Sequence, residues 1–107
     1  MSDRVKKYYH ELRRLNKALP RVRELSVKNC DDEFILCICE LAFNLYKGNI
    51  HLNSTQFNLI TGFAKRIVKL IDRETTIDKK RKILNISRGL IPAILEPSLA
   101  FLDTILE

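Results

Sequence analysis

The sequence has no tryptophan and contains only three glycines, three prolines and two histidines among its 107 residues. Collagen-like and low-complexity chains contain much more glycine and proline, so the composition excludes both classes. A hydrophobic content of 46% is sufficient for a packed core. The length suits one small domain. No stretch of about 18 or more consecutive apolar residues occurs, so the sequence predicts no transmembrane helix.

Signal-peptide features are absent from residues 1–16, which contain no apolar run. The three cysteines, Cys30, Cys37 and Cys39, are an odd number in a chain without an export signal. We therefore expect reduced thiols, a protein that is not secreted, and an intracellular location. Cys30 and Cys37 are seven residues apart and are expected to share one buried face.

No residue pattern points to catalysis or to a metal site. His10 and His51 have no cysteine or carboxylate at ligand spacing, so we expect surface or packing roles for both. On a helix, Cys37 and Cys39 point about 200° apart and cannot hold one metal ion together, and a structural zinc site needs four ligands. The scattered glycines form no phosphate-binding loop. The sequence predicts no catalytic residue, no metal and no cofactor, and it does not predict an enzyme.

Hydrophobic periodicity predicts an all-α fold, a compact bundle of five to six short helices around a buried central helix. Residues 31–47 are that central helix, because acidic residues precede it, Gly48 and Asn49 follow it, and nearly every face between them is apolar. A single domain is expected, with basic helices over residues 1–30, a core with a basic face over 31–88 and an apolar segment over 89–107. The other predicted helices cover about 4–17, 21–29, 54–73, 77–85 and, after a short turn, 97–106.

The predicted helix over about 54–73 carries a regular apolar stripe and a separate basic face. Gly62 lies within it and is expected to mark a close approach between helices. In the next helix, Ile83 and Leu84 are expected to face the core and Lys79–Lys82 to face outward. The stripe consists of Phe57, Ile60, Phe63, Ala64, Ile67, Val68 and Ile71.

Charge is segregated along the chain, whose net charge is +6. Residues 1–30 and 65–88 each carry a net +6, whereas residues 31–64 and 89–107 each carry −3. Such a balance favours anionic partners, because lysine and arginine neutralise phosphates and release counterions. The simpler interpretation is a solvated surface. The candidate nucleic-acid-binding residues are Lys65, Arg66, Lys69, Arg73, Lys79, Lys80, Arg81 and Lys82, extended by Arg13, Arg14 and Lys17.

Aromatic residues are scarce among these cations, where only Tyr8 and Tyr9 are available for stacking on bases. Contact with the backbone of a duplex is therefore favoured over single-strand binding. The sequence does not decide between DNA and RNA.

The segment after Arg88 contains no lysine or arginine and is strongly apolar. It either packs back onto the central helix or forms an amphipathic element that docks on a partner or a membrane. Acidic residues on its polar side disfavour the membrane version. The candidate docking residues are Leu90, Ile91, Ile94, Leu95, Leu99, Phe101, Leu102 and Ile105.

Residues 28–97 contain the stretches "KNCDDEFILCICELAFNLYKGNIHLNSTQ", "TTIDKKRKIL" and "GLIPAIL". These motifs resemble a family of small basic proteins encoded by Maverick/Polinton elements, the virus-like DNA transposons of animal genomes that are related to adintoviruses. The sequence differs from that family in three respects. A proline is absent near "NSTQ", a glycine pair is replaced by Arg88–Gly89, and the C-terminal tail is less glycine-rich and ends in acids. The matching residues are Asn29–Asp31, Ile38–Glu40, Asn44, Lys47–Asn49, Lys79–Leu84 and Gly89–Pro97.

The resemblance implies an element that has a capsid and packages a DNA genome, and it implies no catalytic residue. A host nucleus or a virion is the expected location. The leading hypothesis is a sequence-independent nucleic-acid-binding protein that condenses the genome in a virion core. The alternative is an accessory virion module whose apolar C-terminal segment docks on the capsid or perturbs membranes. Nucleic acid is the expected partner, and capsid, another protein or a second copy of the chain are further ones.

Overall fold

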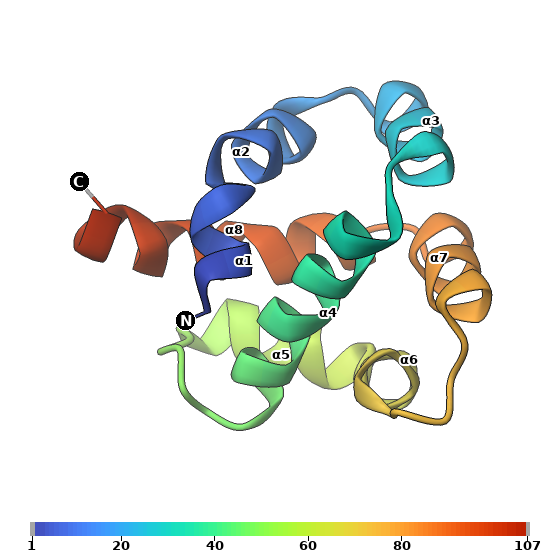
Figure 1. Cartoon of the computed structure of the whole chain (residues 1–107). Helices are drawn as coiled ribbons and strands as arrows, with labels where there is room; N and C mark the ends of the chain where they lie inside the picture. The colour runs from blue at the N-terminus through green and yellow to red at the C-terminus, as the bar shows by residue number, and fades with distance from the viewer. Residues whose placement is uncertain (1, 107) are drawn as a thin grey trace.

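The computed structural model describes residues 2–106, and these residues form eight α-helices and no β-strand. The predicted all-α fold is confirmed (Figure 1). The helices are α1 (Asp3–Lys7), α2 (Tyr9–Lys17), α3 (Pro20–Asn29), α4 (Asp32–Tyr46), α5 (Ser54–Gly62), α6 (Ala64–Ile71), α7 (Ile77–Ile86) and α8 (Leu90–Leu106).

Helix α4 is the buried centre of the fold, as its apolar sequence predicts. Asp31 caps its first turn, where the carboxylate accepts a hydrogen bond from the amide nitrogen of Phe34 at 2.9 Å. Gly48, with φ at 76°, follows its end in the left-handed region that favours glycine. Helices α1, α6, α7 and α8 all pack against α4, so most of the core is organised around this one element.

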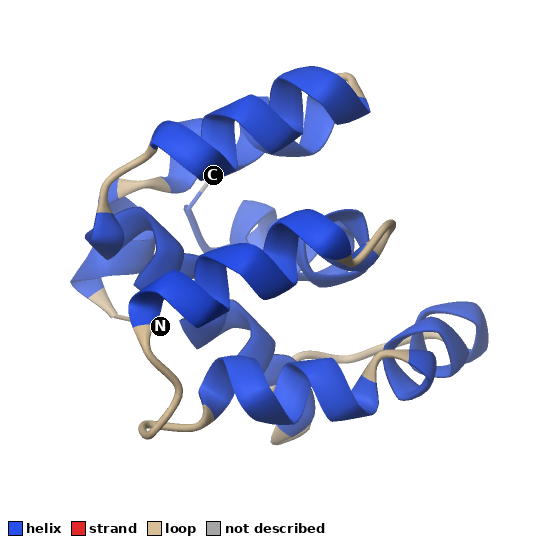
Figure 2. Cartoon of the chain, turned by 90° about the vertical axis from the view of Figure 1, so that its right-hand side faces the viewer, coloured by secondary structure: helices blue, strands red, loops and turns tan. Residues whose placement is uncertain are grey.

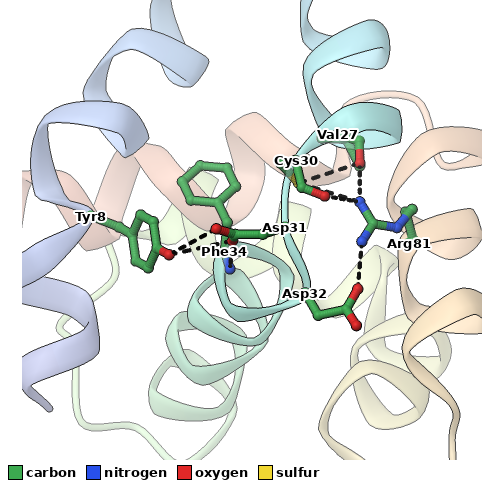
Figure 3. A network of polar contacts seen from close by, with 7 residues as sticks. All are labelled: Tyr8, Val27, Cys30, Asp31, Asp32, Phe34 and Arg81. Atoms are coloured by element: carbon green, nitrogen blue, oxygen red, sulfur yellow. Dashed lines mark hydrogen bonds and ion pairs between the residues drawn. The ribbon is translucent and has the colours of Figure 1, made fainter.

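The first predicted helix, over residues 4–17, is interrupted at Tyr8, which separates α1 from α2. The break allows the Tyr8 ring to pack edge-on against Phe34, with ring centroids 5.3 Å apart. The Tyr8 hydroxyl also lies 3.2 Å and 3.3 Å from the two carboxylate oxygens of Asp31 (Figure 3). Tertiary packing on the start of α4 thus overrides a continuous helical pattern.

The predicted helix over 54–73 is also interrupted, at Phe63 between α5 and α6. Helix α5 packs on α8, whereas α6 packs on α4 and α7, so the break sends the two halves to different neighbours. These two interruptions raise the number of helices from the expected five or six to eight. The start of α5 agrees with the sequence, because Asn53 and Gln56 form a reciprocal capping box.

The break at Phe63 makes the predicted apolar stripe partly wrong. Ile60 and Ile67 are buried as expected, and Leu70 takes a core position that the stripe omits. In contrast, Phe57 is 60% exposed, Val68 is 44% exposed and Ala64 is exposed. The expected close approach at Gly62 is also wrong, since a Cβ atom added there would have no neighbour within 4 Å.

Helix α8 is continuous from Leu90, although a turn followed by a helix over 97–106 was expected. A proline inside a helix costs about 3 kcal/mol, and Pro97 stands in the middle of α8. The helix continues because apolar side chains before and after Pro97 are buried in the same core. Pro92 lies in the first turn, where a missing N–H breaks no intrahelical hydrogen bond.

Within residues 2–106, no single helix has the length and hydrophobicity of a membrane span; α7 and α8 meet those criteria only as a pair, and they are bent by 98° where they join.

Helices α3, α7 and α6 lie side by side and form one side of the molecule, which faces the viewer in Figure 2. Helix α7 occupies the middle and contacts both of its neighbours. The second basic block, on α6 and α7, therefore lies beside α3 from the first basic block. Helix α2 packs mainly on α8, at the corner of Figure 1 opposite to α6.

Candidate nucleic-acid interface

Exposed cations collect on α6, on the loop that follows it and on α7. This group, which we call the α6–α7 cationic surface, consists of Lys65, Arg66, Lys69, Arg73, Lys79 and Lys82. Helix α6 turns Ile67 and Leu70 into the core and leaves its basic residues in solvent. Three exposed acids, Asp72, Glu74 and Asp78, lie in the same part of the chain. None of the six cations forms an ion pair with another residue in the described part of the chain.

Lys80 does not belong to this surface, so its predicted outward orientation is wrong. Its relative exposure is only 8%. The Lys80 ammonium lies close enough to the buried Cys39 thiol to oppose the rise in the pKa of that thiol. A long lysine stem that covers apolar neighbours accounts for this placement.

Arg81 is the second correction, because its guanidinium points inward and links three helices (Figure 3). Nη1 donates hydrogen bonds to the carbonyl oxygens of Val27, at 2.6 Å, and Cys30, at 2.8 Å. Nη2 lies 2.8 Å from Oδ1 of Asp32. Arg81 thereby joins α7 to the end of α3, where carbonyl groups lack intrahelical partners, and to the start of α4. Its role is structural.

The predicted extension of the binding surface onto α2 is not supported by the positions of its residues. Arg13 lies 2.6 Å from Oδ1 of Asp103 and also contacts the Tyr9 hydroxyl, and Arg14 pairs with Glu11 at 3.5 Å. Lys17 is exposed, but it shares α2 with them, away from α6. The structure does not bring these residues together with the α6–α7 cationic surface.

The two basic blocks therefore differ in how their charge is compensated. In the first block, Arg4 pairs with Glu40 at 3.7 Å and Lys7 pairs with Glu33 at 3.5 Å, in addition to the pairs on α2. The pKa of Lys7 is raised chiefly by the charge of Glu33. Among the described residues of the second block, only Arg81 forms an ion pair. Five cations of the first block also lack an ion pair with a described residue, but they are spread over α1, α2 and α3: Lys6, Lys17, Arg21, Arg23 and Lys28.

Sequence reasoning missed Arg88, which borders a groove between α3 and the turn that joins α7 to α8. The groove has a volume of about 950 Å³, and Arg21 and Arg23 of α3 also line it. The sequence does contain a signal for this site, because Arg88 and Gly89 directly precede a helix. Helix N-termini attract anions, and an arginine there adds positive charge.

The apolar C-terminal segment is mostly part of the core. Six of its eight candidate docking residues are buried, Phe101 is half-buried, and Ile105 is 53% exposed. Packing onto the rest of the fold, one of the two alternatives from the sequence, is the arrangement that the structure has. The six buried residues are Leu90, Ile91, Ile94, Leu95, Leu99 and Leu102.

The cysteines are all free thiols, and burial raises the pKa of each of them. The pKa of Cys37 rises to about 12 and that of Cys39 to about 11. Cys30 lies at the end of α3 beside Arg81, which opposes the rise in its pKa. Between residues 2 and 106, no group of three or more histidine, cysteine or acidic side chains is placed to hold a metal ion.

Comparisons of the chain with protein-family models, with curated proteins and with solved structures give no match.

Proposed function

We propose that the protein binds nucleic acid without sequence preference and that its α6–α7 cationic surface contacts the phosphate backbone. One observation carries this proposal: six exposed lysine and arginine side chains lie on adjacent elements without intramolecular ion pairs within residues 2–106. Exposed cations of this kind exchange their counterions for phosphates, and the release of those ions drives association. Among the described residues, four of the nine cations in the first block are ion-paired, whereas only one of the nine in the second block is.

A duplex is the favoured form of the ligand. Tyr8 and Tyr9, the two aromatic residues within the first basic block, are engaged elsewhere. The Tyr8 hydroxyl contacts Asp31, and Tyr9 is buried with its hydroxyl on Asp103. Neither ring offers a platform for stacking on an unpaired base, which is the usual basis of single-strand affinity.

The biological setting is also part of the proposal and rests on the resemblance to Maverick/Polinton proteins. In a virus-like element that packages DNA, a small protein with unspecific affinity for phosphates would condense the genome in the virion core. Packaging requires no base contacts, because phosphate contacts are independent of sequence.

The alternative function, docking of the apolar C-terminal segment on a capsid or a membrane, has less support. Six of the eight side chains concerned lie in the core, and their release would expose apolar surface to water. Ile105 is the one exposed member of the eight, and its side chain could contact a partner without a change in the core.

The proposal is tested by reversing two charges. We expect Lys79→Glu/Lys82→Glu to weaken duplex binding at least about tenfold, because two phosphate contacts are lost. Each lost contact should also reduce the slope of log affinity against log salt concentration by about one. The matched control, Lys6→Glu/Lys17→Glu, changes the net charge equally on α1 and α2. Equal losses in both variants would show that net charge alone governs binding and would refute the assignment to α6 and α7.

A further inference from the structure

The groove between α3 and the start of α8 has features of a ligand site that the α6–α7 cationic surface lacks. Its volume of about 950 Å³ is at the upper end of the usual range for small-molecule pockets. Arg21 and Arg88 line it and are exposed, and neither forms an ion pair with a described residue. Arg23 lines it too, although its Nε and Nη2 already donate to carbonyl groups at the end of α2. Among the described residues that line the groove, Glu24 is the only acid.

Backbone donors gather at one end of this groove. Helix α8 begins at Leu90 and runs for 17 residues, so its N-terminus carries the partial positive charge of a long helix. Within the described residues, the amide N–H groups of Arg88, Gly89 and Ile91 donate no hydrogen bond. Gly89 has φ at 81°, a conformation that helps successive N–H groups to form a concave anion site.

A buried side chain at the same place also lacks a partner. Ser87 lines the groove with a relative exposure of only 3%, and its Oγ makes no hydrogen bond. The side-chain oxygen of Asn85, another lining residue, is buried and unpartnered as well. Buried polar atoms are almost always hydrogen-bonded, so these two leave hydrogen-bonding capacity unused at the wall of the groove, and each would meet a bound molecule after a side-chain rotation. A serine hydroxyl can donate to a phosphate oxygen, and an amide oxygen can accept from a hydroxyl or amino group.

We propose that this groove binds a nucleotide, with its phosphate at the N-terminus of α8 and its sugar or base along α3. The phosphate would accept hydrogen bonds from the free N–H groups and from the side chains of Ser87 and Arg88. Arg21 would add charge from the opposite wall. This site goes beyond the proposed function, because it holds one nucleotide in a groove instead of contacting a continuous backbone on α6 and α7.

Titration of the full chain with ADP, followed by ¹H–¹⁵N correlation spectra, tests the proposal. Chemical shifts of the Arg88, Gly89 and Ile91 amides are expected to move in a saturable way, and pyrophosphate is expected to move the same amides with lower affinity. If ADP leaves these amides unchanged, or moves mainly amides of α6, the proposal is overturned.

Variants separate the groove from the cationic surface. Arg88→Ala is expected to weaken ADP binding about tenfold, the effect of one lost charge-assisted hydrogen bond. The matched control Arg66→Ala removes an arginine from α6 and is expected to leave ADP binding unchanged. Ser87→Ala is expected to weaken ADP binding without lowering the thermal midpoint of the free protein, because the hydroxyl has no partner to lose. Equal ADP affinities of wild type and Arg88→Ala would refute the site.

A second pair of ligands identifies the source of the nucleotide. An oligonucleotide with a 5′-phosphate and its unphosphorylated counterpart are titrated in the same way as ADP. Stronger shifts from the phosphorylated strand would place a strand end in the groove, whereas shifts from ADP alone would assign it to a free nucleotide. If ADP leaves the groove amides unchanged, the site is refuted whatever the strand does, while the salt-dependent duplex affinity assigned to α6 and α7 is unaffected.

Discussion

Arg81 donates its shortest hydrogen bond to the carbonyl oxygen of Val27, with Nη1 and the oxygen 2.6 Å apart. This contact ties the middle of the basic run to the end of α3, and the ion pair with Asp32 extends the link to α4. The run Lys79–Lys82 therefore divides into residues that hold the fold together and residues that face solvent.

Replacing Arg81 with alanine should lower the free energy of unfolding by about 2 kcal/mol, since carbonyl groups at the end of α3 and a carboxylate lose a charged partner. The side chain is only 17% exposed, which limits compensation by water. Lys82→Ala, at an exposed neighbouring position, should change stability by less than about 0.5 kcal/mol. Urea unfolding of both variants measures the difference, and equal stabilities would contradict the structural role of Arg81.

The contact between Tyr9, Arg13 and Asp103 should make stability depend on pH. The hydrogen bond from Tyr9, followed by the contact with Arg13, holds the pKa of Asp103 below its ordinary value. A lowered folded-state pKa means that the carboxylate stabilises the protein above its unfolded pKa, near 3.9. This contribution disappears as the pH falls through the folded-state pKa.

Asp103→Asn should therefore be less stable than wild type at neutral pH, and the difference should shrink as the pH is lowered below about 4. Glu96→Gln removes an exposed acid from the same helix and serves as the control. Urea midpoints at a series of pH values measure both. A difference between Asp103→Asn and wild type that does not change with pH would contradict the assignment.

Truncation of Leu102 tests whether the C-terminal segment is docked. Leu102 is fully buried, so Leu102→Ala should destabilise the protein by about 2–5 kcal/mol. Ile105, one turn further along α8, is 53% exposed, and Ile105→Ala should cost less than about 1 kcal/mol. Calorimetric or chemical unfolding distinguishes them. A small effect for Leu102→Ala would indicate a detached segment and would revive the alternative function.

The thiols should react in a defined order. At neutral pH, Cys37 and Cys39 are protonated and buried, with pKa values of about 12 and about 11, so neither offers an accessible thiolate. Cys30 is half-buried and should react first with a thiol reagent. Peptide mapping after brief labelling checks the order, and Cys30→Ser should abolish the fast phase. Equally fast labelling of Cys39 would contradict the packing of α4.

The parts of the fold that sequence predicts well are those where local signals and burial agree. Helix α4 has a capping aspartate, an apolar body and a terminal glycine, and its observed bounds differ from the prediction by a single residue at each end. The interruption at Tyr8 has no such local signal, and the one at Phe63 has only Gly62, the last residue of α5. Each arises because the flanking helices pack on different partners, which a hydrophobic pattern does not report.

The candidate site was only partly predictable for a related reason. Consecutive residues on a helix are separated by about 100°, so four in a row span about 300° and cannot all face solvent. Helix geometry alone therefore argues against the expectation that all of Lys79–Lys82 face outward. It does not indicate that Arg81 meets the end of α3, some fifty positions earlier, or that Arg88 and Ser87 share a groove with Arg21.

Binding of a labelled random-sequence DNA duplex across a salt series is the most direct test of the proposed function. The exposed cations of α6 and α7 predict a logarithmic salt dependence that corresponds to about five phosphate contacts, with the same affinity for unrelated duplexes. Weak binding with little salt dependence would mean that these cations only solvate the surface, and the proposed role in nucleic-acid binding would be wrong.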